Sequence, residues 1–162
     1  MSQNLELIAI LKAVRRLSRA LDVHSSRINR ESGLTLPQLV VLTCIRDLGE
    51  VTSRAIAQAA DLSAPTVVGI LDKLEAKGLI QRYRSDKDRR IVHTRLTDAG
   101  ARLLVNAPSL LGDAFETRFL SLLDDERATL MSAVQTVAGM TVTDVPQDAA
   151  ESADGDEPVG SA

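Results

Sequence analysis

The sequence predicts a mainly α-helical fold with one small β-hairpin. Hydrophobic residues make up 44% of the 162-residue chain, but aromatic residues make up only 2%. The core must therefore be built from Leu, Val, Ile and Ala, which favours packed helices over a large sheet. Apolar residues at helical spacing dominate the chain, and only two short stretches near its middle resemble strands. The length suits one domain, or one domain with a tail.

A long amphipathic helix is predicted at the N-terminus, over about residues 4–31, with Gly33 as its stop. Its apolar residues follow the i, i+3, i+4, i+7 rule and are Leu7, Ile10, Leu11, Val14, Leu17 and Leu21. Its basic residues lie mainly on the other side. A second helix begins at the capping box formed by Thr35 and Gln38. Residues 39–45 of that helix are apolar on nearly every side, which predicts a place at the centre of the fold.

Two short helices joined by a tight turn follow. Thr52 caps the first, which ends near Ala60, and Ser63 caps the second, which ends before Gly78. Packing of the second helix on the first leaves an outward face that is small and polar, so its backbone can approach a groove closely. That face is formed by Ser63, Pro65, Thr66, Gly69, Asp72 and Lys73. Many helix pairs are only packing units, so the pair by itself does not establish a binding function.

A basic hairpin comes next, with strands predicted at 80–84 and 91–96 around the loop 85–90. Residues 78–95 hold six Lys or Arg against Asp86 and Asp88, a local charge of +4. The cations of this predicted wing are Arg82, Arg84, Lys87, Arg89, Arg90 and Arg95. Such a loop fits a wing that grips phosphate or enters a minor groove, and the alternative is a solvated turn. Directly after a helix-turn-helix, the pattern favours binding of double-stranded DNA.

The formal net charge of −3 conceals this basic region. Residues 144–162 hold six acids and no Lys or Arg, and without them the charge becomes +3. The composition from 141 to 162 predicts an acidic, disordered tail. Two interpretations of the tail stay open: a solubilising end, or a regulatory arm that competes with DNA for the wing.

Two further helical segments are predicted after the hairpin, for six helices in all. Thr97 caps the fifth, Pro108 is expected to kink or interrupt it, and Asp124 begins the last. The first and last helices each carry an apolar stripe that one small lobe cannot cover, which predicts a homodimer.

Other classes of function find little support. There is no nucleophile–base–acid set and no Gly-rich phosphate loop, so we expect no enzyme and no catalytic residue. The only histidines are His24 and His93, so no metal site or cofactor is expected, and His93 is predicted at the surface near phosphate. The single cysteine, Cys44, is either a core residue or a thiol sensor. One cysteine, no long apolar run and no signal-peptide pattern favour a cytoplasmic protein without a membrane partner.

The motifs resemble those of the MarR family of transcriptional regulators. Asp88-Arg89-Arg90 followed by Leu96-Thr97 and Gly100 is similar to the family's wing signature, and the stretches 34–38 and 71–80 also resemble family sequence. The resemblance implies a winged helix-turn-helix dimer on a pseudo-palindromic operator, most often as a repressor. It implies a recognition helix in the major groove and a wing in the minor groove, with Ser53 and Arg54 as further helix-turn-helix contacts. Many relatives bind small-molecule effectors, and no residue here identifies one.

Four segments follow from this interpretation. Residues 1–34 form an N-terminal dimerisation helix, 35–97 the DNA-binding lobe, 98–140 C-terminal dimerisation helices, and 141–162 the acidic tail.

Gly69 stands where many relatives have Arg, so their operator preference does not carry over. The stretch 27–41 resembles repressors of osmolyte (ectoine) biosynthesis. The rival interpretation is a winged-helix module that binds proteins and not DNA.

Overall fold

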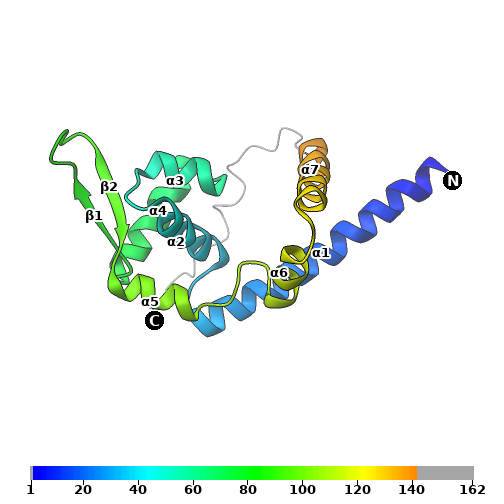
Figure 1. Cartoon of the computed structure of the whole chain (residues 1–162), viewed down its shortest axis with the longest axis horizontal. Helices are drawn as coiled ribbons and strands as arrows, with labels where there is room; N and C mark the ends of the chain where they lie inside the picture. Colours follow the sequence, from blue (N-terminus) through cyan, green and yellow to red (C-terminus); the bar gives the residue numbers. More distant parts are fainter. Residues whose placement is uncertain (1, 142–162) are drawn as a thin grey trace, which may run out of the picture. The chain divides into compact units, whose positions relative to one another are not determined.

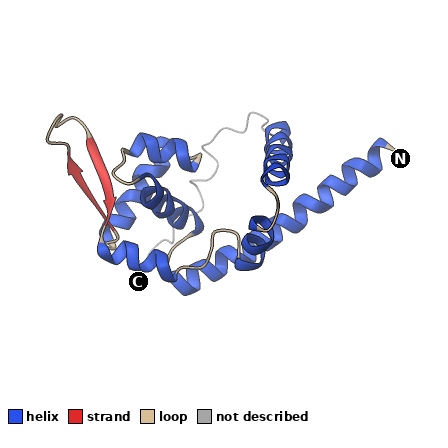
Figure 2. Cartoon of the chain, viewed as in Figure 1, coloured by secondary structure: helices blue, strands red, loops and turns tan. Residues whose placement is uncertain are grey.

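The computed structural model describes residues 2–141, which form seven α-helices and a two-stranded sheet (Figures 1 and 2). This confirms the mainly helical fold with one hairpin. The acidic tail predicted at the C-terminus lies outside the described residues, apart from its first position. The elements are α1 (Gln3–Ser32), α2 (Leu36–Leu48), α3 (Ser53–Ala60), α4 (Ala64–Ala76), β1 (Ile80–Arg84), β2 (Val92–Leu96), α5 (Asp98–Asn106), α6 (Asp113–Leu120) and α7 (Asp124–Thr141). The chain divides into two units, residues 1–117 and 118–162, with α6 crossing the boundary.

Helix α2 forms the centre of the first unit, as its all-round apolar sequence predicts. It packs against α1, α3, α4, α5 and β2. Leu39, Val41, Leu42 and Ile45 are all at most 1% exposed. The predicted capping box is present, because the Thr35 hydroxyl accepts from the Gln38 amide and the Gln38 side chain accepts from the Thr35 amide. The helix therefore begins where the sequence predicts, and its buried side chains form much of the hydrophobic core.

The hairpin is antiparallel, with Ile80 opposite Leu96, Arg82 opposite Thr94, and Arg84 opposite Val92. Strand β1 has the predicted bounds, and β2 begins one residue later than expected. Val51 forms an additional bridge to Thr94, with amide-to-carbonyl distances of 3.1 and 2.7 Å. The segment between α2 and α3 is thus hydrogen-bonded to β2 and attaches the hairpin to the lobe. The sequence did not predict this long-range pairing of Val51 with Thr94.

The junction between the hairpin and α5 requires glycine at position 100. The Thr97 hydroxyl accepts from the Gly100 amide at 3.1 Å and donates to the Gly78 carbonyl at 2.7 Å. A Cβ atom at Gly100 would lie 2.1 Å from the carbonyl oxygen of Leu79. The capped helix therefore starts in direct contact with the backbone that leads into β1.

The predicted fifth helix is two helices, so the expected total of six was wrong. Helix α5 ends at Asn106, and Ala107 has the extended φ of −71° and ψ of 148° that the following Pro108 favours. The chain resumes helical structure only at Asp113, after Gly112. Proline therefore produces a complete break here and not a kink.

The C-terminal half of α1 is attached to this break. The His24 Nε2 atom lies 2.6 Å from the Ser109 carbonyl oxygen, and Arg27 lies 3.7 Å from the Asp113 carboxylate. Ile28 is fully buried in the core. The N-terminal half of α1 has no such contacts: residues 2–23 are all exposed within the single chain, including the predicted apolar stripe.

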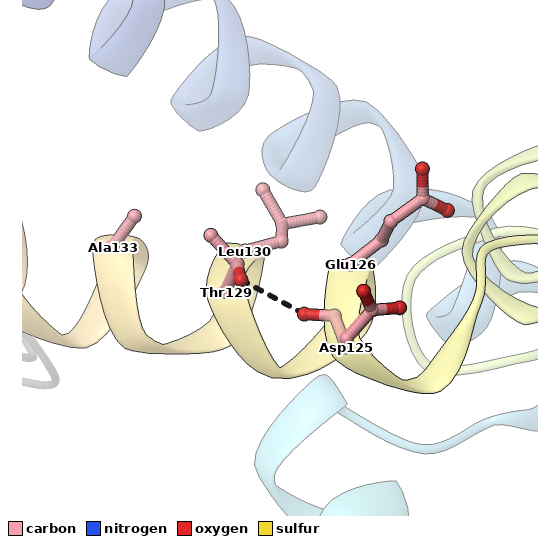
Figure 3. A pocket seen from close by; sticks show the side chains of 5 residues that line it. All are labelled: Asp125, Glu126, Thr129, Leu130 and Ala133. Atoms are coloured by element: carbon pink, nitrogen blue, oxygen red, sulfur yellow. Dashed lines mark hydrogen bonds between the residues drawn. The ribbon is translucent and has the colours of Figure 1, made fainter.

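The second unit is built around α7, which begins at the predicted Asp124. Its first turn holds three acids, which suits the positive end of the helix dipole. Arg127 donates to the Leu122 carbonyl at 2.9 Å and pairs with Asp124. A shallow hollow on α7 is lined by Asp125, Glu126, Thr129, Leu130 and Ala133 (Figure 3). All five residues belong to one helix, so the hollow lacks the enclosure of a typical ligand site.

Candidate nucleic-acid interface

Helices α3 and α4 form the predicted helix-turn-helix. Asp61 takes the left-handed conformation, with φ of 52° and ψ of 48°, so Asp serves where a glycine is common. The Leu62 amide donates to the Ala57 carbonyl at 3.0 Å and closes the turn. Ile56 of α3 and Val67 of α4 are fully buried. The pair is therefore a rigid corner that leaves the opposite face of α4 exposed.

The exposed face of α4 contains the residues predicted for DNA recognition. Pro65, Thr66, Gly69, Asp72 and Lys73 are all exposed, and Ser63 is half-buried at the N-cap. The Ser63 hydroxyl accepts from the Thr66 amide at 3.3 Å and lies 2.7 Å from the Thr66 hydroxyl. Ser53 and Arg54, at the start of α3, are exposed as well. Both helix N-termini thus present amides and hydroxyls to solvent, an arrangement that suits phosphate groups.

The wing loop is shaped by its own polar side chains. The Asp88 carboxylate accepts from the Arg90 amide at 3.0 Å, and the Ile91 amide donates to the Asp88 carbonyl at 2.9 Å. The Ser85 hydroxyl accepts from the Lys87 amide at 3.2 Å. An acid in so basic a loop is expected to accept from loop amides and to pair with a guanidinium. The first contact is present, because Asp88 accepts from the Arg90 amide. The second is not seen, since no guanidinium pairs with Asp88 among residues 2–141.

Six cations on α3, α4 and the wing are exposed and form neither an ion pair nor a cation–π contact with another described residue. They are Arg54, Lys73, Arg84, Lys87, Arg89 and Arg90. Because no carboxylate offsets them, their charge is available to an anionic partner. All six were predicted as DNA contacts.

Arg82 differs from these cations. Its guanidinium lies 2.7 Å from the Asp72 carboxylate and 2.5 Å from the Glu75 carboxylate, and its side chain is only 29% exposed. Its hydrogen bonds lower the pKa of Glu75, and Glu75 in turn raises the pKa of Arg82. Arg82 was predicted to bind phosphate together with Arg84, but within the chain it already has two anionic partners.

The other face of the hairpin carries an aromatic and cationic cluster. The rings of Tyr83 and His93 lie 5.8 Å apart, and the Arg95 guanidinium lies 5.1 Å from the centre of the Tyr83 ring. His93 is half-buried, and its Nδ1 atom is buried without a hydrogen-bond partner. His93 is therefore only partly at the surface, with the Tyr83 ring beside it, and its expected place near phosphate stays a prediction.

The remaining reactive residues form no site in the part of the chain that the structure describes. No group of three or more His, Cys, Asp or Glu is placed to hold a metal ion there. Cys44 is half-buried in α2, and burial, reinforced by Asp47, raises the pKa of its thiol. A raised pKa reduces the thiolate fraction at neutral pH, which favours the core interpretation of Cys44 over a sensor. Between residues 2 and 141, no helix is both long and apolar enough to cross a bilayer.

Two contacts near the interface escaped prediction. The Lys77 ammonium donates to the Gly33 carbonyl at 2.5 Å, which attaches the end of α4 to the turn between α1 and α2. Glu75 accepts from both the backbone and the side chain of Arg82. Strand alternation was the available signal for the second contact, since it places Arg82 on the same face as the apolar Ile80.

Comparison with known proteins agrees with this geometry. The model of the MarR family matches residues 34–92, the segment that holds α2, α3, α4 and the wing. The transcriptional regulator HosA of Escherichia coli O157:H7 is 31% identical over 133 residues, covering 82% of this chain and 96% of HosA. The chain belongs to the MarR family of DNA-binding transcriptional regulators. This result confirms the resemblance drawn from the wing motif.

Solved structures share the fold of this MarR-family chain. A Staphylococcus aureus MepR–DNA complex aligns with a TM-score of 0.63 at 23% identity, covering 80% of this chain and 95% of MepR. Bordetella bronchiseptica BpsR, whose DNA binding is regulated by 6-hydroxynicotinic acid, aligns with a TM-score of 0.57 at 25% identity, covering 78% of this chain and 98% of BpsR. The winged-helix architecture is thus shared at low sequence identity. The osmolyte subgroup suggested by residues 27–41 stays a prediction.

Proposed function

We propose that this regulator is a homodimeric repressor that binds a pseudo-palindromic operator. Each subunit places α4 in the major groove and the wing loop in the adjacent minor groove. The observation that carries the proposal is the set of unpaired cations on the wing beside the exposed, small-residue face of α4. Repression follows when the bound dimer blocks access of polymerase to the promoter.

The residues divide by role. We assign base contacts to Pro65 and Thr66, near the N-terminus of α4, where recognition helices reach base edges. Gly69 lets the backbone approach the groove floor, because its Cβ position is open space and carries no side chain. Ser53, Arg54, Ser63, Lys73, Arg84 and Lys87 bind phosphate, while Arg89 and Arg90 enter the minor groove.

The dimer is proposed from the apolar stripe of α1. Within the single chain, Leu7, Ile10, Leu11, Val14, Leu17 and Leu21 are between 37% and 65% exposed. A continuous apolar face of this length needs a partner, and a second copy of the same helix supplies one. In this proposal residues 1–34 and 98–140 build the dimer, and 35–97 bind DNA. The acidic residues beyond 141 remain a solubilising end or a competitor for the wing.

We also propose that a small-molecule effector controls DNA binding, and we do not assign the chemical identity of that molecule. The regulation of BpsR by 6-hydroxynicotinic acid suggests that a small molecule releases this protein from DNA as well. We place the protein in the cytoplasm, because operator DNA is its proposed partner. We propose no membrane partner and no enzymatic activity.

The experiment is selection of bound duplexes from fragmented genomic DNA, followed by a gel shift across a salt series. The proposal expects recovery of a sequence with two-fold symmetry and affinity that falls steeply with salt. Transcription in vitro from a promoter that holds this sequence should fall when the protein is added. Failure to retain any duplex, with the fold intact, would instead favour the winged-helix module that binds proteins.

A further inference from the structure

Arg82 joins the wing to the recognition helix. The carboxylate of Glu75 accepts from the Arg82 backbone amide at 3.1 Å, from Nε at 2.8 Å and from Nη2 at 2.5 Å. The Nη2 atom also lies 2.7 Å from Asp72. One residue of β1 is therefore bonded to two positions of α4 that are three residues apart and share one side of that helix.

These contacts lie at the base of the wing. Ile80 is buried at the start of β1, and Thr94, opposite Arg82, is 1% exposed. Between Arg82 and Thr94 no residue is fully buried, and residues 86–92 are all exposed. Among the hydrogen bonds and ion pairs of residues 2–141, those of Arg82 are the last that join β1 to α4 before the exposed loop. A change at Arg82 is therefore expected to move the loop cations, which lie several residues farther out.

We propose that Arg82 is a positioning residue, which with Asp72 and Glu75 fixes the wing relative to the recognition helix, and that it does not itself bind phosphate. The proposal rests on the function above, in which α4 and the wing contact one operator together. Two carboxylates more than offset the single charge of Arg82, so its attraction for DNA is cancelled. The planar fork of arginine makes the paired contacts, and lysine cannot reproduce them.

The alternative is that Arg82 is an ordinary phosphate contact. The salt slope is the change in the logarithm of the binding constant with the logarithm of the salt concentration. If Arg82 binds phosphate, its loss reduces the size of this slope by about 1.8 for a dimer, from about 0.9 per phosphate contact in each subunit. Removal of the Glu75 charge then strengthens DNA binding, because an acid near the phosphates is gone. The positioning role predicts instead that removal of the Glu75 charge weakens DNA binding. The effect of this variant on affinity therefore separates the two accounts.

The experiment measures affinity for a duplex that the wild-type protein selects, across a salt series, for Arg82→Gln, Glu75→Gln, the double variant and Arg84→Gln. We expect each of the first two variants to bind about threefold to tenfold more weakly with an unchanged slope. The double variant should be no weaker than either single variant, because both remove the same contact. Arg84→Gln is the matched control two residues along the strand, and its slope should flatten.

Two further readouts separate geometry from charge. Arg82→Lys keeps the charge, and we expect it to bind as weakly as Arg82→Gln. Without DNA, the Arg82 amide should exchange its hydrogen faster in Glu75→Ala than in wild type, because it loses its acceptor. Thermal melting by circular dichroism confirms that each variant is folded.

The outcomes are distinct. A flattened slope for Arg82→Gln, recovery of affinity by Arg82→Lys, or tighter binding by Glu75→Gln would overturn the positioning role. If wild-type protein selects no duplex at all, the proposed function fails, and the exchange rate of the Arg82 amide still tests the contact between β1 and α4.

Discussion

Arg82 and Arg84 stand two residues apart on the same strand face, yet the structure gives them different surroundings. Arg82 has two carboxylate partners, whereas Arg84 is exposed and has none among the described residues. The sequence predicted both as phosphate contacts, because composition alone does not show which cations are already paired. Helix caps such as Thr52 and Ser63 were predicted correctly, since a cap depends on only a few neighbouring residues.

At the residue scale, Thr66 tests base recognition. Thr66→Ala should change the discrimination between operator and scrambled DNA by roughly 1–3 kcal/mol per contacted base pair, because Thr66 is exposed near the N-terminus of α4. Arg84→Ala should instead weaken binding to both duplexes alike. The measurement is a titration of both duplexes with each variant. Equal losses on both duplexes for Thr66→Ala would remove its assigned role.

At the scale of elements, local signals predicted the helices well and long-range contacts poorly. The bounds of β1 and the starts of α2, α3, α4 and α7 follow from alternation, caps and proline position. The pairing of Val51 with Thr94 joins segments more than forty positions apart, so no local pattern indicates it. The length of the break after Pro108 was also missed, because a proline marks where a helix stops and not where the next one begins.

The wing loop gives an element-scale prediction. Arg90→Ala should lower operator affinity at least tenfold, on the order of 1.4 kcal/mol, because a dimer loses two contacts at once. The salt slope should flatten by about 1.8 if each Arg90 meets a phosphate, and stay nearly unchanged if it meets only base edges. Arg89→Ala is the comparison. The measurement is operator binding across a salt series.

Asp88→Ala provides the control for loop shape. It removes a negative charge from the wing, yet binding should weaken, because the Arg90 amide loses its acceptor. Unchanged affinity in all three variants, with an intact circular dichroism spectrum, would mean that the wing does not touch DNA.

The junction of β1 and α5 gives a prediction of stability. Gly100→Ala should reduce the free energy of unfolding by about 2–3 kcal/mol, because the new methyl group overlaps the Leu79 carbonyl. Gly139→Ala is the matched control, since its Cβ position is open and alanine favours a helix by up to about 1 kcal/mol. Urea denaturation measures both. Equal stability of Gly100→Ala and wild type would show that the close approach is not maintained in solution.

At the scale of the whole molecule, the apolar stripe of α1 predicts assembly. The Val14→Glu, Leu17→Glu double variant should weaken dimerisation by more than about a hundredfold, because burial of unpaired carboxylates costs several kcal/mol. Both side chains are exposed in the single chain, at 41% and 54%, so the lobe should still fold. Lys12→Glu, on the other side of α1, is the control and should remain dimeric. Light scattering at micromolar protein concentration measures the molar mass of wild type and variants. A monomeric wild type would contradict the proposed dimer.

The central claim is that two subunits each place α4 in a major groove and a wing in the adjacent minor groove. Methylation interference on the selected duplex tests it directly, because dimethyl sulfate modifies guanine N7 in the major groove and adenine N3 in the minor groove. The account predicts two symmetric blocks of N7 interference about one helical turn apart, roughly 10–11 base pairs, each flanked by N3 interference. A single asymmetric block, or binding without interference at N7, would contradict it.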